Sequence, residues 1–135
     1  STAGAFWDLD DADITFNNGA IVTIDDWENK DVNTFTFNLG SSGFSTLTPN
    51  NFFIGNGFTH NPGSIANATY NVDMASYTGG NNVITLVDYV SDFAGMNDAT
   101  FQGAGGLNVL NPGANSGAIY WDNVAEAIRL NVNQT

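Results

Sequence analysis

Closely spaced acidic side chains are the densest set of groups in this sequence that could do chemistry. The run from Asp8 to Asp13 holds four aspartates, and Asp25 and Asp26 follow it. Calcium takes about six to eight hard oxygen ligands, so the cluster predicts a Ca²⁺ site. The alternative is a solvated acidic face, because the run lacks the glycine and the glutamate of an EF-hand loop. The predicted calcium ligands are Asp8, Asp10, Asp11, Asp13, Asp25 and Asp26.

Catalytic motifs are not recognisable in this sequence. The chain has no cysteine and one histidine, His60, which excludes thiolate sites and the usual histidine-rich zinc cages. The serines of Gly40-Ser-Ser-Gly43 lie in a turn sequence and lack the context of a nucleophile elbow. No carboxylate pair sits in a glycosidase signature. We therefore expect a protein that is not an enzyme.

Aromatic residues suggest a second chemistry, the stacking of sugar rings. The chain contains ten Phe, three Trp and four Tyr. Carbohydrate-binding modules are β-sandwiches of about this size that present Trp or Tyr to a glycan. The competing interpretation is that these rings fill the core. If the chain binds glycans, the predicted platform is Trp27, Tyr77 and Trp121.

Apolar residues near the N-terminus and in a double-Phe segment predict self-association. The stretch from Ala3 to Leu9 is short and apolar, which predicts either a strand donated to another copy or an ordinary strand of the chain's own sheet. Phe52 and Phe53 are adjacent, so one of them faces outward from a strand. The strands carry no lysine, the residue that commonly protects sheet edges. The predicted contact residues are Phe6, Trp7, Leu9, Phe52 and Phe53.

Charge and length narrow the class of protein. The 135 residues form one domain's worth of sequence, and 14 acidic residues against two basic ones give a net charge of −12. Without a basic patch we expect no nucleic-acid partner, and without a long apolar run we expect no membrane insertion. A surface rich in Asn, Thr, Ser and Gly but poor in Lys is typical of secreted bacterial β-proteins. Residues 1–33 stand apart as an acidic N-terminal segment.

Alternating apolar and polar residues predict strands along the whole chain. Thr34–Leu39 and Ala68–Met74 each place their apolar residues on one face. Val83–Val90 is the most apolar run and predicts a central strand buried on both faces. Ala118–Trp121 and Ala127–Val132 predict a closing hairpin. Helix signals are weak throughout.

A turn signal and a faint repeat occur near the N-terminus. The sequence Asn17-Asn18-Gly19 separates Asp13–Phe16 from Ala20–Ile24, which predicts a hairpin or a tight corner. Ile14-Thr-Phe-Asn-Asn-Gly19 is echoed 21 residues later by Phe35-Thr-Phe-Asn-Leu-Gly40. That spacing is about one coil of a β-solenoid, although a β-sandwich of about eight strands accounts for it too.

Three segments carry a resemblance to a known class. Phe35–Pro49, Tyr70–Tyr89 and Ile119–Val132 resemble pieces of large secreted bacterial surface proteins. The likeness is to autotransporter-type β-strand repeat proteins and to the last folded module before a C-terminal sorting tail. The resemblance implies a secreted, surface-associated protein, often a β-helix or a β-sandwich, and it supplies no catalytic motif.

These observations predict a single all-β domain over residues 1–135, either β-solenoid-like or a β-sandwich, with the resemblance favouring the solenoid. The expected function is that of a non-enzymatic structural module of a bacterial cell surface or extracellular matrix. We expect it to be a homo-oligomer or polymer, with a filament as one form, and Ca²⁺ as its one candidate cofactor. The alternative is a secreted carbohydrate-binding module with a polysaccharide partner.

Overall fold

The computed structural model describes residues 6–9, 11–21, 26–29, 33–48, 51–54, 68–88, 97–104 and 106–134. For strands β1, β3 and β5 only the backbone is described. The elements, in chain order, are β1 (Phe6–Leu9), β2 (Asp13–Asn17), β3 (Asp26–Asn29), β4 (Asn33–Asn38), β5 (Asn51–Ile54), β6 (Ala68–Asp73), β7 (Asn82–Asp88), α1 (Asp98–Ala104), β8 (Gly106–Leu110), β9 (Asn115–Asp122) and β10 (Ala127–Gln134).

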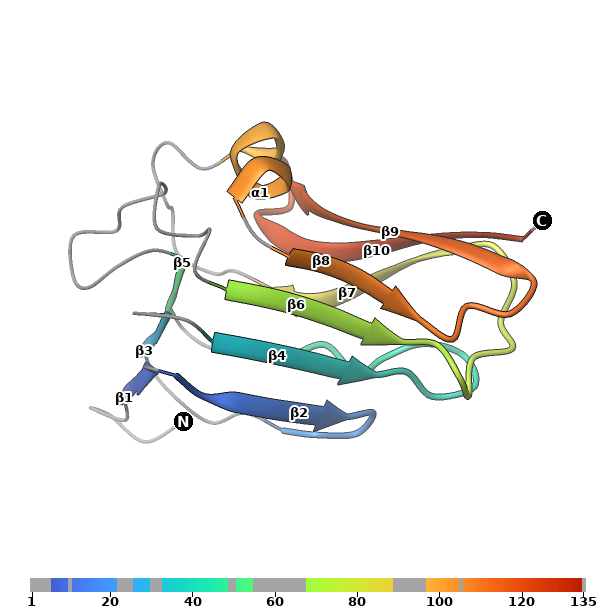
Figure 1. Cartoon of the computed structure of the whole chain (residues 1–135), viewed down its shortest axis with the longest axis horizontal. Coiled ribbons are helices and arrows are strands. Elements are labelled where there is room, and N and C mark those ends of the chain that lie inside the picture. The colour runs from blue at the N-terminus through green and yellow to red at the C-terminus, as the bar shows by residue number, and fades with distance from the viewer. Residues whose placement is uncertain are drawn as a thin grey trace.

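Two parallel sheets are wound together along the chain. One has the order β1-β3-β5 and the other β2-β4-β6-β8, so the strands from β1 to β6 alternate between the two sheets (Figure 1). Each of these first three turns of the chain adds one strand to each sheet, which is the geometry of a solenoid. The prediction of an all-β chain is confirmed, and the parallel pairing favours the solenoid-like alternative over the sandwich.

The predicted 21-residue repeat corresponds to the first coil of this arrangement. In the β2–β4 pairing Ile14 lies beside Phe35 and Phe16 beside Phe37, in strict parallel register. The rings of Phe16 and Phe37 stack with their centroids 5.5 Å apart. The next two coils are longer, since Thr34 pairs with Thr69 and Thr69 with Gly106. A coil that varies in length explains why no third copy is visible in the sequence.

The core follows the alternation that the sequence predicts. Phe35, Phe37 and Leu39 are buried, and the polar residues between them are half-buried on the outer face. The same alternation in β6 buries Ala68, Tyr70, Val72 and Met74. Since side chains of successive parallel strands align in rows, each inner row becomes a continuous apolar ladder.

A third, antiparallel sheet of order β7-β10-β9 closes the structure. The predicted hairpin of β9 and β10 is confirmed, with Asp122 paired to Ala127 next to the turn. Its last strand buries Ile128, Leu130 and Val132 on one face, as predicted.

The prediction of a central strand over Val83–Val90 is wrong for the residues that are described. β10 is the central strand of the third sheet, whereas β7 pairs on its other side only through one bridge, between Leu47 and Val87. Val83 is 49% exposed as a result. A register shift opposite Ile128 turns both Leu86 and Val87 inward, which accounts for the unusually apolar sequence.

The hairpin alternative for Asp13–Ile24 is also wrong. β2 pairs in parallel with β4, and Ala20 and Ile21 lie outside any strand. The tight corner is what forms, with Gly19 at a φ of +94° that suits glycine. Residues 22–24 lie outside the described residues.

The sequence analysis missed the helix α1. Its seven residues are too few to be stable alone, so packing against β9 must hold it. Asp98 in its first turn and Gln102 one turn later both bond to that strand.

Candidate functional site

The side of β2 that faces away from β4 is an unpaired sheet edge of the described chain, and we call it the open edge of β2. Thr34 donates its N–H to the carbonyl of Ala12, and Asn18 donates to Asn38, so the even-numbered residues of this segment bond to β4. In a parallel pair the intervening residues point their backbone groups the other way. The N–H groups of Asp13, Thr15 and Asn17 therefore face a side on which no described strand pairs.

The β9 edge of the third sheet is covered by a helix. There, Trp121 of β9 donates its backbone N–H to Asp98 Oδ1 at 3.0 Å. Gln102 Nε2 donates to the carbonyl of Ile119 at 2.7 Å. Both backbone groups lie on the side of β9 away from β10, so α1 covers this part of the edge and satisfies these two polar groups.

The outer face of the β2-β4-β6-β8 sheet is a polar ladder made mostly of Asn and Thr, with Asp13 on β2 and Asp73 on β6. Asn38 donates its side-chain amide to Asn17 Oδ1 at 2.9 Å, and Asn108 donates to Asn71 at 3.0 Å. These bonds link neighbouring strands and use up part of the hydrogen-bonding capacity of the face. The ladder ends at β2, where the amide hydrogens of Asn17 are left to donate outward.

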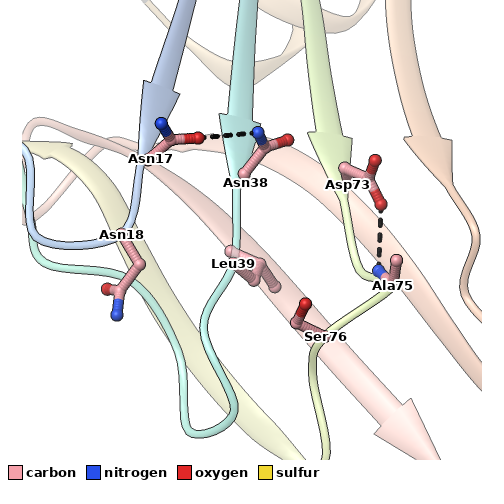
Figure 2. A pocket seen from close by; sticks show the side chains of 7 residues that line it. All are labelled: Asn17, Asn18, Asn38, Leu39, Asp73, Ala75 and Ser76. Carbon is pink, nitrogen blue, oxygen red and sulfur yellow. Dashed lines mark hydrogen bonds between the residues drawn. The ribbon is translucent and has the colours of Figure 1, made fainter.

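A polar recess of about 350 Å³ opens where β2, β4 and β6 end (Figure 2). It is lined by Asn17, Asn18, Asn38, Leu39, Asp73, Ala75 and Ser76. Asp73 is the one ionisable residue of this lining, and its Oδ1 already accepts from Ala75 N and Asn111 Nδ2. The recess can form hydrogen bonds, but its lining pairs no second carboxylate with Asp73 and no base with Ser76.

The predicted calcium ligands are only partly described. Asp11 and Asp13 are exposed next to and on β2, and Asp11 has a φ of 55°. Asp8 and Asp26 lie on β1 and β3, whose backbones alone are described, and Asp10 and Asp25 lie outside the described residues. Within the described part, no three acidic or histidine side chains come together as metal ligands would. The Ca²⁺ site remains a prediction.

The predicted contact residues lie on the outer strands of the β1-β3-β5 sheet. Phe6, Trp7 and Leu9 belong to β1, and Phe52 and Phe53 belong to β5. β1 pairs with β3 of its own chain, so in this structure it is an edge strand rather than a donated one.

Two residues of the predicted glycan platform are core residues. Tyr77 is 6% exposed and Trp121 is 3% exposed, so neither ring is available to stack on a sugar. The Tyr77 hydroxyl donates to the carbonyl of Gly80, which holds the ring against its own turn. Trp27 lies on β3, where only the backbone is described. Both rings are buried because large aromatic side chains stabilise the core by removing apolar surface from water.

Electrostatic interactions among the described residues concentrate at the β9–β10 turn. Asp122 Oδ1 accepts from the N–H groups of Val124 and Ala125, and Asp122 Oδ2 pairs with Arg129 at 2.8 Å. The N–H of Ala125, with help from Val124 and Arg129, holds the pKa of Asp122 below its usual value. Arg129 also donates to Thr85, which ties all three strands of this sheet together. These groups stabilise a turn and have no reacting partner.

Sequence reasoning placed the unprotected edge at β1 and did not single out β2. The available signal was Asp13-Ile-Thr-Phe-Asn17, a short strand without lysine next to an Asn-Gly turn.

Comparison with known proteins found no matching family model, no similar curated protein and no similar solved structure. Among the described residues, no helix has the length and apolar character that crossing a bilayer requires.

Proposed function

We propose that this chain is a non-enzymatic structural module of a bacterial cell surface or extracellular matrix, and that it self-associates through the open edge of β2. The observation that carries the proposal is the contrast between two sheet edges, that of β9 and that of β2. α1 bonds two outward backbone groups of the β9 edge, whereas no described strand pairs with the N–H groups of Asp13, Thr15 and Asn17 on β2. An uncovered edge without lysine is a template for another strand, and the one charged side chain on β2 is Asp13 at its first residue.

Incompletely buried apolar side chains on and near β2 support the proposed self-association. Ile21, four residues after the end of β2, is 86% exposed. Ile14, Ala20 and Phe44 are only partly buried where they pack against the core. In a solenoid, the end coil leaves part of its core open unless a cap or another coil covers it. A partner at β2 would bury these groups.

Secretion is part of the proposal and rests on composition and resemblance. The surface is poor in lysine and rich in Asn and Thr, and the outer face of the β2-β4-β6-β8 sheet carries them in hydrogen-bonded rows. Such rows add stability between coils without charged side chains. This suits a scaffold better than a catalyst, since the described recess pairs no acid with a base.

Sedimentation velocity tests the proposal directly. We expect the wild-type chain to associate reversibly as its concentration rises. Thr15→Lys places a charge in the middle of the open edge of β2 and should leave the protein monomeric. Val124→Lys, at a position 96% exposed in the β9–β10 turn, adds the same charge elsewhere and should associate like the wild type. A wild-type monomer at every concentration would contradict the proposed self-association.

A further inference from the structure

We infer that the partner at the open edge of β2 is a second copy of this chain, which pairs its own β2 antiparallel about a two-fold axis at Thr15. This inference rests on the proposed function and specifies its geometry. A two-fold pairing uses the same surface on both copies, so one self-complementary strand is sufficient. β2 has the sequence Asp-Ile-Thr-Phe-Asn.

The side chains of β2 are complementary to themselves in this register. With Thr15 opposite Thr15 of the second copy, Asp13 lies opposite Asn17 of the second copy. The Oδ1 of Asn17 already accepts from Asn38, so its amide hydrogens are left to donate to the Asp13 carboxylate. The pairing joins a charged acceptor to a neutral donor, and it avoids placing two carboxylates together.

The inner face matches in the same way. Ile14, which is only partly buried, comes opposite the buried Phe16 of the second copy, so the pairing brings apolar residues together on the inner face. A two-fold axis perpendicular to the sheet keeps inner faces on one side and outer faces on the other. This register also pairs all five residues of β2, whereas a shift toward Asp13 would leave residues of the strand unpaired and bring the two Asp13 side chains nearer each other.

Head-to-tail stacking is the alternative to this pairing, because no described strand pairs with the outer side of β8 either. β9 packs against β8, and a Cβ added at Gly117 would stand 3.2 Å from Val109 Cγ1. Val109 faces the core, so this contact leaves the outer edge of β8 unpaired. The self-complementary residues of β2 favour a closed dimer over a filament built by adding coils, and cross-linking separates the two.

Cysteine cross-linking tests the geometry, and the natural chain has no cysteine to interfere. Thr15→Cys places one thiol on the inferred two-fold axis. Directly opposite residues of a hydrogen-bonded antiparallel pair have Cα atoms about 5.5 Å apart, which a disulfide spans. At about 10 µM protein we expect Thr15→Cys to form disulfide dimers about 100-fold faster than Asn108→Cys, because pairing raises the local thiol concentration to the millimolar range. Asn108 is the matched control, exposed on the outer face of β8 at the other end of the sheet.

A mixture of variants tests the register. Asp13→Cys and a tagged Asn17→Cys should cross-link with each other when mixed, and each alone should form few disulfides. If Thr15→Cys cross-links but this mixture does not, the register centred on Thr15 is wrong.

The outcomes separate this inference from the proposed function. A chain that associates while Thr15→Cys cross-links no faster than Asn108→Cys would keep the self-association and overturn the two-fold pairing. A ladder of higher oligomers from the Thr15→Cys/Asn108→Cys double variant would show head-to-tail addition instead. A wild-type chain that stays monomeric in sedimentation would remove both proposals. Association that is lost in Thr15→Lys, together with dimers from Thr15→Cys, would support both.

Discussion

At the scale of single residues, the hydroxyl of Tyr70 is the clearest local conflict in the described core. The residue is 1% exposed, its ring packs against Phe35 and Phe101, and its oxygen has no hydrogen-bond partner. A buried polar group without a partner lowers stability by about 1–3 kcal/mol. The ring is needed by the core and the hydroxyl is not.

We predict that Tyr70→Phe leaves the free energy of unfolding unchanged or raises it by about 1 kcal/mol, since it removes a buried unpaired group. Tyr70→Ala should lower it by about 3–5 kcal/mol, because the variant leaves a cavity between two aromatic rings. Urea denaturation followed by fluorescence measures both. A loss of more than about 1 kcal/mol in Tyr70→Phe would show that the hydroxyl has a stabilising partner.

The same residue predicts a loss of stability at alkaline pH. Burial raises the pKa of Tyr70 above its ordinary value, so the folded state holds the neutral form. The unfolded chain ionises near pH 10, and stability is therefore complete below that pH and falls above it. Unfolding free energies of wild type and Tyr70→Phe, compared from about pH 8 to 11, should diverge above about pH 10. Parallel curves would contradict the assignment.

Asp122 predicts the opposite dependence at acid pH. Its pKa is lowered in the folded state by the N–H of Ala125, the N–H of Val124 and Arg129, so its contribution is present above its ordinary pKa of about 4 and is lost as the pH falls through the lowered value. We expect Asp122→Ala to lower the free energy of unfolding at pH 7 by about 1–2 kcal/mol, a partly exposed group contributing less than a buried one.

Asp122→Asn is the matched control for this turn. It keeps an acceptor for the two N–H groups and loses the charge, so its effect should be the smaller of the two. Thermal unfolding from about pH 3 to 7 should show a shallower acid slope for both variants than for the wild type. An unchanged slope would mean that other carboxylates account for the acid dependence.

At the scale of elements, α1 functions as the cover of an edge strand. Its side chains bond the outward backbone groups of Ile119 and Trp121, which the antiparallel pairing with β10 leaves unused. A seven-residue helix contributes little stability of its own, so this contact explains why the helix exists at this place.

We predict that Asp98→Ala accelerates hydrogen exchange of the Trp121 amide by about tenfold, which corresponds to the loss of about 1.4 kcal/mol of local protection. Ser116→Ala, on the same strand, should leave that amide unchanged. Exchange measured by NMR on labelled protein resolves the single site. Equal rates in all three proteins would show that α1 does not protect this edge.

At the scale of the whole molecule, net charge opposes the proposed association. Each copy carries a net charge of −12, so two copies repel each other even where their edges are complementary. Screening shortens the range of this repulsion to about 10 Å at 0.1 M salt. The edge contacts are backbone hydrogen bonds and apolar packing, which salt weakens little.

We predict that the dissociation constant of the wild-type dimer falls as NaCl is raised from about 20 mM to about 300 mM, because screening reduces the repulsion. Sedimentation equilibrium measures the constant. An association that weakens with salt would indicate opposite charges at the interface and would exclude the β2 pairing.

The same experiment tests the predicted calcium site when CaCl₂ replaces NaCl at equal ionic strength. A Ca²⁺ site in the acidic N-terminal segment should strengthen association beyond the effect of screening, and EDTA should reverse the gain. MgCl₂ is the control, since Mg²⁺ loses its water ligands reluctantly. Equal constants in the three salts would leave calcium with no part in assembly.

The sequence by itself determined the local pattern of this protein. The alternation in Thr34–Leu39 and Ala68–Met74 identifies strands and their buried faces, because a strand's side chains alternate with a period of two whatever it pairs with. The echo of Ile14–Gly19 in Phe35–Gly40 identifies the first coil for the same reason, since parallel neighbours in register bury like residues together.

Tertiary structure decided which strands are neighbours and which edges stay open. Val83–Val90 reads as a central strand, yet its apolar content reflects a register shift that only the pairing with β10 produces. Tyr77 and Trp121 are residue types that suit a glycan-binding platform, but both side chains are packed in the core. α1 forms because β9 has unpaired backbone groups that it can bond, and β2 stays an edge strand because no described strand pairs with its outer side. These outcomes depend on contacts between residues far apart in the chain, which a local pattern of side chains does not contain.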